Sequence, residues 1–135
     1  LSSEVTVLDY HAADGTFSAV ATYSMLPADW HEANGGAAIR VSKDGRFLYA
    51  SNRGYNSIVV YAISDDSRQL RAIQQMSTDG EFPRDFNLSA NDDFLLAVNQ
   101  NSDNGTLYRR DAQTGLLTAC QKDLETPEGV CVLFH

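Results

Sequence analysis

Two arginines supply the most specific chemistry that this sequence offers. Arg53 follows an apolar run and precedes Gly54, and Arg84 follows Pro83 further along the chain. A guanidinium group can bind a carboxylate or a phosphate through two parallel hydrogen bonds. We therefore take Arg53 as the candidate catalytic and substrate-binding residue, and Arg84 as a second substrate-binding residue. Each side chain also fits a plainer role, as a surface arginine bonded to the carbonyls of its own loop.

Two asparagines repeat at equivalent places, since Asn52 and Asn99 stand 47 residues apart in similar surroundings. Both are candidates for substrate binding, although repetition also favours a role in holding turns. His31 could act as a general base, but no neighbour in the sequence would orient it. The chain lacks a Gly-rich phosphate loop, a GxSxG motif and an HExxH motif. The usual signatures of nucleotide binding, serine hydrolysis and zinc proteolysis are therefore missing, and we predict no cofactor.

The elements that position these residues form an internal repeat. Residues 39–63 return as residues 86–110, and equivalent positions, such as Phe47 and Phe94, are 47 residues apart. A fixed period near 50 residues, built from short strand-like runs, is typical of a β-propeller blade. Apolar runs on consecutive positions indicate strands that are covered on both faces. The sequence therefore predicts an all-β fold.

The repeat divides the chain into a β-propeller fragment with two complete four-stranded blades and a partial blade at each end. We assign the end of one blade to 1–24, full blades to 37–77 and 85–122, and the first strand of a closing blade to 130–134. A propeller closes with about 4 to 8 blades. We therefore expect missing amino-terminal blades of a longer parent, or self-association of copies, to cover the open edges.

The strand order of such a meander gathers loops at one rim. The loop before the first strand and the loop between the second and third strands share that rim, which we take as the candidate site face. The polar residues expected there are His31, Glu32, Asn34, Asn52, Arg53, Asn56, Arg84, Asp85, Asn99, Gln100, Asn101 and Glu128.

Composition limits the partners. The 135 residues carry a net charge of −8, which disfavours nucleic acid. No run of about 18 apolar residues could cross a bilayer, so we expect no membrane partner. Cys120 and Cys131 lie in apolar or strand-like runs at no metal-ligand spacing. We expect both thiols to be reduced and buried, in keeping with a cytoplasmic protein.

Four motifs in order carry a resemblance. They are IRVSKDGRFLYASNRG at 39–54, PRDFNLS at 83–89, DFLLAVNQNSDN at 93–104 and the final PEGVCVLFH. Together they resemble the carboxy-terminal part of the seven-bladed lactonases of the 6-phosphogluconolactonase type. The resemblance implies a cytoplasmic hydrolase that opens 6-phosphogluconolactone to 6-phosphogluconate in the pentose phosphate pathway, with a small anionic lactone as substrate and no metal.

The same resemblance assigns parts of the site. Arg53 matches the arginine of the family's SNRG motif, and Arg84 lies in its PR motif. Much of the acid and base apparatus would lie upstream, so this chain would supply part of the site and be inactive alone. Ala38 stands where the family often has Glu, and Tyr55 where it often has His. Two alternatives stay open: a non-catalytic propeller used as a binding platform, and a lactonising or lactonase enzyme for another carboxylated lactone.

Overall fold

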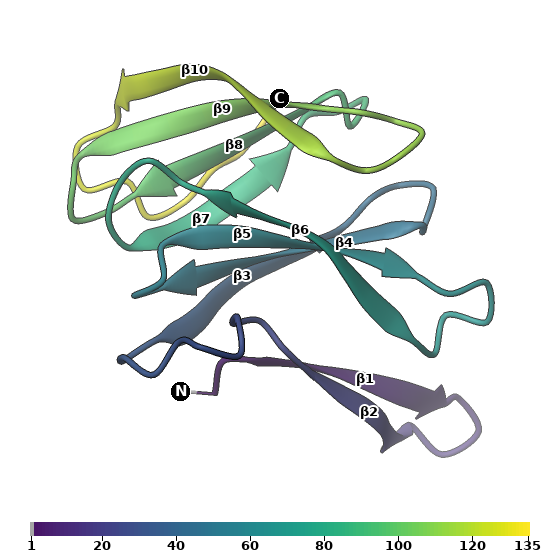
Figure 1. Cartoon of the computed structure of the whole chain (residues 1–135). Helices are drawn as coiled ribbons and strands as arrows, with labels where there is room; N and C mark the ends of the chain where they lie inside the picture. The colour runs from purple at the N-terminus through teal and green to yellow at the C-terminus, as the bar shows by residue number, and fades with distance from the viewer. Residues whose placement is uncertain (1) are drawn as a thin grey trace.

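Ten antiparallel strands in three sheets make up the computed structural model, which describes residues 2–135 (Figure 1). Leu1, the first residue of the expected half blade at 1–24, lies outside the described residues. The first sheet is a hairpin of β1 (Glu4–His11) and β2 (Thr16–Ser24). Within residues 2–135, no helix is long and apolar enough to span a membrane.

The other two sheets are four-stranded meanders. One has the order β3-β4-β5-β6 and the other β7-β8-β9-β10, so consecutive strands are neighbours throughout. Their bounds are β3 (Gly35–Val41), β4 (Phe47–Arg53), β5 (Ser57–Ile63), β6 (Leu70–Ser77), β7 (Pro83–Leu88), β8 (Phe94–Asn99), β9 (Asn104–Arg110) and β10 (Leu117–Glu125). The three sheets follow one another in chain order (Figure 1).

The strand register reproduces the sequence repeat. Leu48 pairs with Tyr61 in the first meander, and Leu95 pairs with Tyr108 in the second. Each residue of the second pair is 47 residues beyond its counterpart in the first pair, the same interval that separates the repeats in the sequence. The prediction of an all-β fold with two complete four-stranded blades is therefore confirmed.

The main core lies between the two complete blades. Strand β4 is buried along almost its whole length, which explains the consecutive apolar residues in its sequence. One blade contributes Phe47, Tyr49, Ile58 and Val60, and the other contributes Phe86, Leu95, Ala97, Tyr108 and Leu117. A second core joins the hairpin to the first complete blade through Val5, Met25, Leu48, Ala50, Val59, Tyr61 and Leu70.

Repeated hydrogen bonds join each complete blade to the element before it. The hydroxyl of Tyr61 donates to the carbonyl oxygen of Ser24 at 2.6 Å, and the hydroxyl of Tyr108 donates to that of Ser77. Burial raises the pKa of Tyr61 to about 12, so its hydroxyl keeps the proton that it donates. The third strand of each blade thus holds the last strand of its predecessor.

Strand bounds differ from expectation mainly where strands leave the candidate site rim. Strand β3 begins at Gly35 because this glycine and Gly36 pair with Arg53 and Asn52. Strand β7 begins at Pro83, opposite Asn99. The expected strand at 130–134 is absent among the described residues, because Val132 bonds to side chains of β7 and not to the backbone of a neighbouring strand.

The carboxy-terminal segment is instead held by isolated hydrogen bonds. The amide of Val132 donates to Asp85 Oδ2 at 2.8 Å, and Asn87 Nδ2 donates to the carbonyl oxygen of Val132 at 3.1 Å. Cys120 and Cys131 are free thiols, but the expectation that they are buried is wrong because both are exposed. Cys120 lies on the edge strand β10, and no sheet covers the segment that contains Cys131.

Candidate functional site

A pocket of about 320 Å³ opens at the rim where the sequence analysis placed the candidate site. Three segments form it: the loop before β3, the end of β4, and the loop between β6 and β7. The first complete blade and the second therefore both contribute. The lining residues are Ala33, Asn34, Gly35, Arg53, Gly54 and Phe82.

Arg53 is the charged residue of this pocket. Its Nη2 atom donates to the carbonyl oxygen of Gly36 at 2.9 Å, and its guanidinium lies over the Phe82 ring, 5.0 Å from the ring centroid. The Nε atom is buried and has no hydrogen-bond partner. One nitrogen and one face of the guanidinium are thus fixed, while hydrogen-bond donors remain for a ligand.

Gly54 allows the first loop to approach the end of β4. It has a φ of 119°, and a Cβ atom there would lie 2.3 Å from the carbonyl oxygen of Ala33, so no side chain fits. Asn34 then joins the two segments: its Oδ1 accepts from the amide of Tyr55 at 2.9 Å, and its Nδ2 donates to Asn52 Oδ1 at 3.0 Å. The pocket wall beside Arg53 is therefore hydrogen-bonded to its neighbours.

Phe82 forms the opposite wall, and its backbone is held on both sides. Its φ is 65°, a left-handed conformation that is unfavourable for a bulky side chain. The Phe82 amide donates to Asn56 Oδ1 at 3.0 Å, and its carbonyl oxygen accepts from the amide of Gln100 at 3.0 Å. These two bonds keep the ring beneath the Arg53 guanidinium.

Asn52 and Asn99 are placed away from the pocket surface. Both side chains belong to residues with 0% exposure. Asn52 Nδ2 donates to the carbonyl oxygen of Met25 at 2.8 Å, and Asn99 Nδ2 donates to that of Thr78 at 3.0 Å. Both side chains therefore hold neighbouring backbone in this structure, and their contact with substrate stays a prediction.

Four further rim candidates, Arg84, Asp85, His31 and Glu32, are not among the residues that line the pocket. Arg84 is exposed, does not line the pocket, and has Nη1 3.5 Å from Gln100 Oε1. Asp85 is buried, where Arg40 Nη2 lies 3.2 Å from its Oδ1. His31 and Glu32 are exposed residues outside the pocket lining. Arg53 is thus the single predicted anion-binding residue in the pocket.

This arrangement can bind an anion, but the described lining residues include no carboxylate or imidazole to act as acid or base. Within residues 2–135 no three His, Cys, Asp or Glu side chains are grouped as metal ligands. Sequence reasoning missed Phe82. The signal for it was a lone aromatic residue directly before Pro83 and Arg84, in a loop of the candidate rim.

Two repeated four-stranded meanders, packed face to face with a pocket on one rim, define the chain as part of a β-propeller. It belongs to the family described as "Lactonase, 7-bladed beta-propeller", whose sequence profile matches residues 1–134. The resemblance stated from the motifs is therefore confirmed.

Several relatives show how much of such a propeller the chain covers. It is 39% identical over 134 residues to 6-phosphogluconolactonase of Bacillus subtilis. The matched residues make up 99% of this chain and 38% of that protein. A solved structure from Lactobacillus plantarum is 50% identical with a TM-score of 0.95, over 97% of this chain and 38% of that one. The periplasmic gluconolactonase of Pseudomonas aeruginosa is 35% identical with a TM-score of 0.88, over 95% of this chain and 35% of that one.

Proposed function

We propose that the propeller to which this chain belongs hydrolyses a lactone and that the chain supplies the anion-binding part of the site. The observation that carries the proposal is the Arg53 guanidinium, held over Phe82 in a pocket of a lactonase-family rim. The other blades would come from a longer parent chain, or from further copies of this one.

For the substrate we propose 6-phosphogluconolactone, converted to 6-phosphogluconate in the pentose phosphate pathway. The support is the similarity to the 6-phosphogluconolactonase of Bacillus subtilis, together with a guanidinium that suits a phosphate group. The protein carries a net charge of −8, so a local cation is needed to attract an anionic sugar. Because the Pseudomonas relative is named a gluconolactonase, unphosphorylated gluconolactone is the main alternative substrate. A cytoplasmic location belongs to the same proposal.

The chemistry divides between Arg53 and groups outside the pocket lining. Water adds to the carbonyl carbon of the ring ester, the tetrahedral intermediate collapses, and the ring oxygen leaves and takes up a proton. Arg53 would hold the anionic group of the lactone so that its carbonyl faces the attacking water. The general base and acid would come from the other blades, as the motif resemblance implies.

Kinetics of the complete propeller test this proposal. Arg53→Ala should raise KM for the phosphorylated lactone by about 100-fold, whereas KM for unphosphorylated gluconolactone should change by about threefold or less. The KM of Arg53→Lys for the phosphorylated lactone should lie between those of the wild type and Arg53→Ala, because a lysine keeps the charge without the planar guanidinium. Arg84→Ala tests the second proposed substrate-binding residue, and we expect a smaller rise in KM because Arg84 lies outside the pocket lining. Equal kinetics of the wild type and Arg53→Ala on the phosphorylated lactone would contradict the proposal.

A binding platform without catalysis is the second candidate, since the described pocket residues include no acid or base. In that case the complete propeller would bind a phosphorylated sugar acid through Arg53 and hydrolyse no lactone. Calorimetric titration beside the kinetic assay separates the two functions.

A further inference from the structure

We propose that Asn56 is a positioning residue that sets the shape of the Arg53–Phe82 pocket without lining it. This inference rests on the proposed function, because it concerns affinity at the same pocket. Asn56 lies between β4 and β5, whereas Phe82 comes from the loop that leads into the next blade. One side chain thus joins the two walls of the pocket.

The side-chain oxygen of Asn56 has two backbone donors. Its Oδ1 accepts from the amide of Gly54 at 3.1 Å and from the amide of Phe82 at 3.0 Å. Gly54 adjoins Arg53, so the same oxygen holds the arginine segment and the aromatic residue beneath the guanidinium. The separation between the cation and the ring therefore depends on this oxygen.

The backbone of Asn56 strengthens the same connection. Its carbonyl oxygen accepts from both the amide and the hydroxyl of Thr78, each at 3.0 Å. Both Asn56 and Phe82 have a positive φ, 50° and 65° respectively. Such conformations persist where surrounding bonds specify them, and here those bonds run between Asn56 and the loop that carries Phe82.

The next repeat contains the same hydrogen-bonding arrangement away from the pocket, and this arrangement provides a matched control. Asp103 is 47 residues beyond Asn56 and has a φ of 55°. Its Oδ1 accepts from the amide of Glu128 at 2.8 Å, and its carbonyl oxygen accepts from the amide of Thr126 at 3.0 Å. Glu128, like Phe82, has a positive φ, of 46°. The loop-holding geometry therefore repeats, whereas the pocket with a cation on an aromatic ring occurs at Asn56.

Three variants of the complete propeller test the role of Asn56. Asn56→Gly tolerates the positive φ and removes the shared acceptor, Asn56→Asp keeps an acceptor oxygen, and Asp103→Gly makes the equivalent change in the next blade. The rate of amide hydrogen exchange at Phe82 measures how well the hydrogen bond from this amide to Asn56 protects it. We expect faster exchange in Asn56→Gly, and protection close to wild type in Asn56→Asp and Asp103→Gly.

The kinetic readout separates positioning from a general loss of stability. Asn56→Gly should raise KM for the phosphorylated lactone about tenfold with kcat within about threefold, because affinity for the anion falls while the chemical groups stay in place. Asp103→Gly should lose similar thermal stability and keep KM within about twofold. An unchanged KM in Asn56→Gly, an equal rise in both glycine variants, or unchanged exchange at Phe82 would overturn the inference.

A failure of the proposed function can be told apart from a failure of this inference. If the wild-type propeller hydrolyses no lactone, calorimetric titration with inorganic phosphate replaces KM. Affinity about tenfold weaker in Asn56→Gly than in Asp103→Gly would support the positioning role. Equal affinities, or no phosphate binding by the wild type, would overturn it.

Discussion

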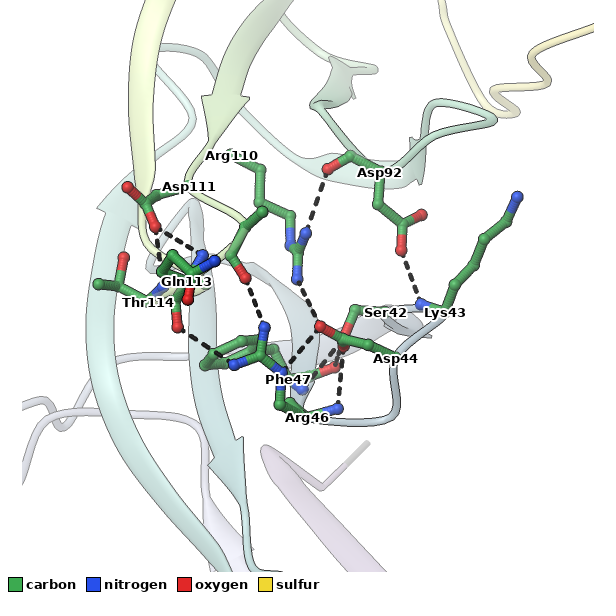
Figure 2. Close-up of polar contacts among 12 residues, drawn as sticks. Ser42, Lys43, Asp44, Arg46, Phe47, Asp92, Arg110, Asp111, Gln113 and Thr114 are labelled. Atoms are coloured by element: carbon green, nitrogen blue, oxygen red, sulfur yellow. Dashed lines mark hydrogen bonds and ion pairs between the residues drawn. The ribbon is translucent and has the colours of Figure 1, made fainter.

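Arg110 Nε donates a hydrogen bond to the hydroxyl oxygen of Tyr49 at 2.6 Å, across the boundary between the two complete blades. The Tyr49 hydroxyl in turn donates to the carbonyl oxygen of Gly115 at 2.8 Å. The Arg110 side chain is only 4% exposed, and its Nη2 lies 3.9 Å from Asp44 Oδ2. Figure 2 shows Arg110 pointing from its blade toward Asp44 and toward the backbone of Asp92.

The rim opposite the pocket is thus occupied by contacts between the blades. Arg46 reaches from the β3–β4 turn to the β9–β10 turn, where Nη2 donates to the carbonyl oxygen of Ala112 at 2.6 Å (Figure 2). Asp92 Oδ2 accepts from the amide of Lys43 at 2.6 Å. Because these polar groups bond to one another, this rim stabilises the blade interface, while the other rim carries the pocket.

Tyr49→Phe should destabilise the protein more than Tyr61→Phe. Tyr49 loses an oxygen that makes two hydrogen bonds and leaves the buried Arg110 without one of its partners, a loss of about 2 kcal/mol. Tyr61 loses one bond, to Ser24, for about 1 kcal/mol. Urea unfolding of the complete propeller measures both. Equal losses would mean that the Arg110 contact adds nothing to the blade interface.

Gly115→Ala should cost more stability than Gly45→Ala, although both glycines have nearly the same positive φ, 74° and 72°. A Cβ atom at Gly115 would lie 2.3 Å from Phe47 Cδ1, whereas no atom is within 4 Å at Gly45. Strain alone should cost about 1 kcal/mol at Gly45, and overpacking against Phe47 should bring the loss at Gly115 to about 3 kcal/mol. Thermal unfolding midpoints provide the comparison, and similar midpoints would contradict it.

Asp44 should make stability depend on acid pH. A hydrogen bond from the Ser42 hydroxyl, together with the backbone and guanidinium of Arg46, lowers the pKa of Asp44 from 3.8 to about 2. The folded state therefore favours the carboxylate, so this stabilisation is present above pH 4 and is lost as the pH falls toward 2. The side chain is 38% exposed, and solvent weakens the effect.

Asp44→Asn tests that dependence. The unfolding midpoint of the wild type should fall more steeply than that of the variant between about pH 4 and pH 2, because an amide does not titrate there. Parallel curves for the two proteins would show that the Ser42 and Arg46 contacts do not stabilise the ionised form.

The sequence repeat predicts the strands well because equivalent residues keep the same partners, as Leu48 with Tyr61 and Leu95 with Tyr108 do. It fails where a contact joins residues from different repeats. Nothing in the local pattern places the Phe82 ring beneath Arg53, since that contact depends on how two blades pack. The strand at 130–134 was predicted from its likeness to earlier first strands, but a ladder needs a neighbour that local pattern cannot supply.

The pocket residue that the sequence missed gives a further prediction. Phe82→Leu keeps an apolar side chain but removes the aromatic face under the guanidinium, a contact worth about 1 kcal/mol. KM for the phosphorylated lactone should rise about fivefold, since Arg53 loses the surface that holds it toward the ligand. Phe94→Leu is the matched control, because its ring lies 5.0 Å from the guanidinium carbon of Arg109, in another arginine–phenylalanine pair outside the pocket.

The exposed apolar edges predict how the 135-residue chain behaves when it is produced alone. Phe17 is 63% exposed and Leu133 is 80% exposed. Val41 and Ile39 line an open groove between the hairpin and the first complete blade. Apolar surface of this extent is unfavourable in water, so the chain should associate with other copies or aggregate. Light scattering of the purified chain, with a lactone assay on the same fractions, checks this expectation.

Light scattering and the lactone assay together also show whether the acid and base groups belong to this chain or to further blades. An associated chain without activity agrees with a site that needs further blades, because the described pocket residues contribute a cation and no proton-transfer group. A monomer that hydrolyses lactone would contradict both expectations, and the base would then have to come from this chain's own rim. His31 and Glu32, the exposed candidates beside the pocket loop, would be the first residues to replace.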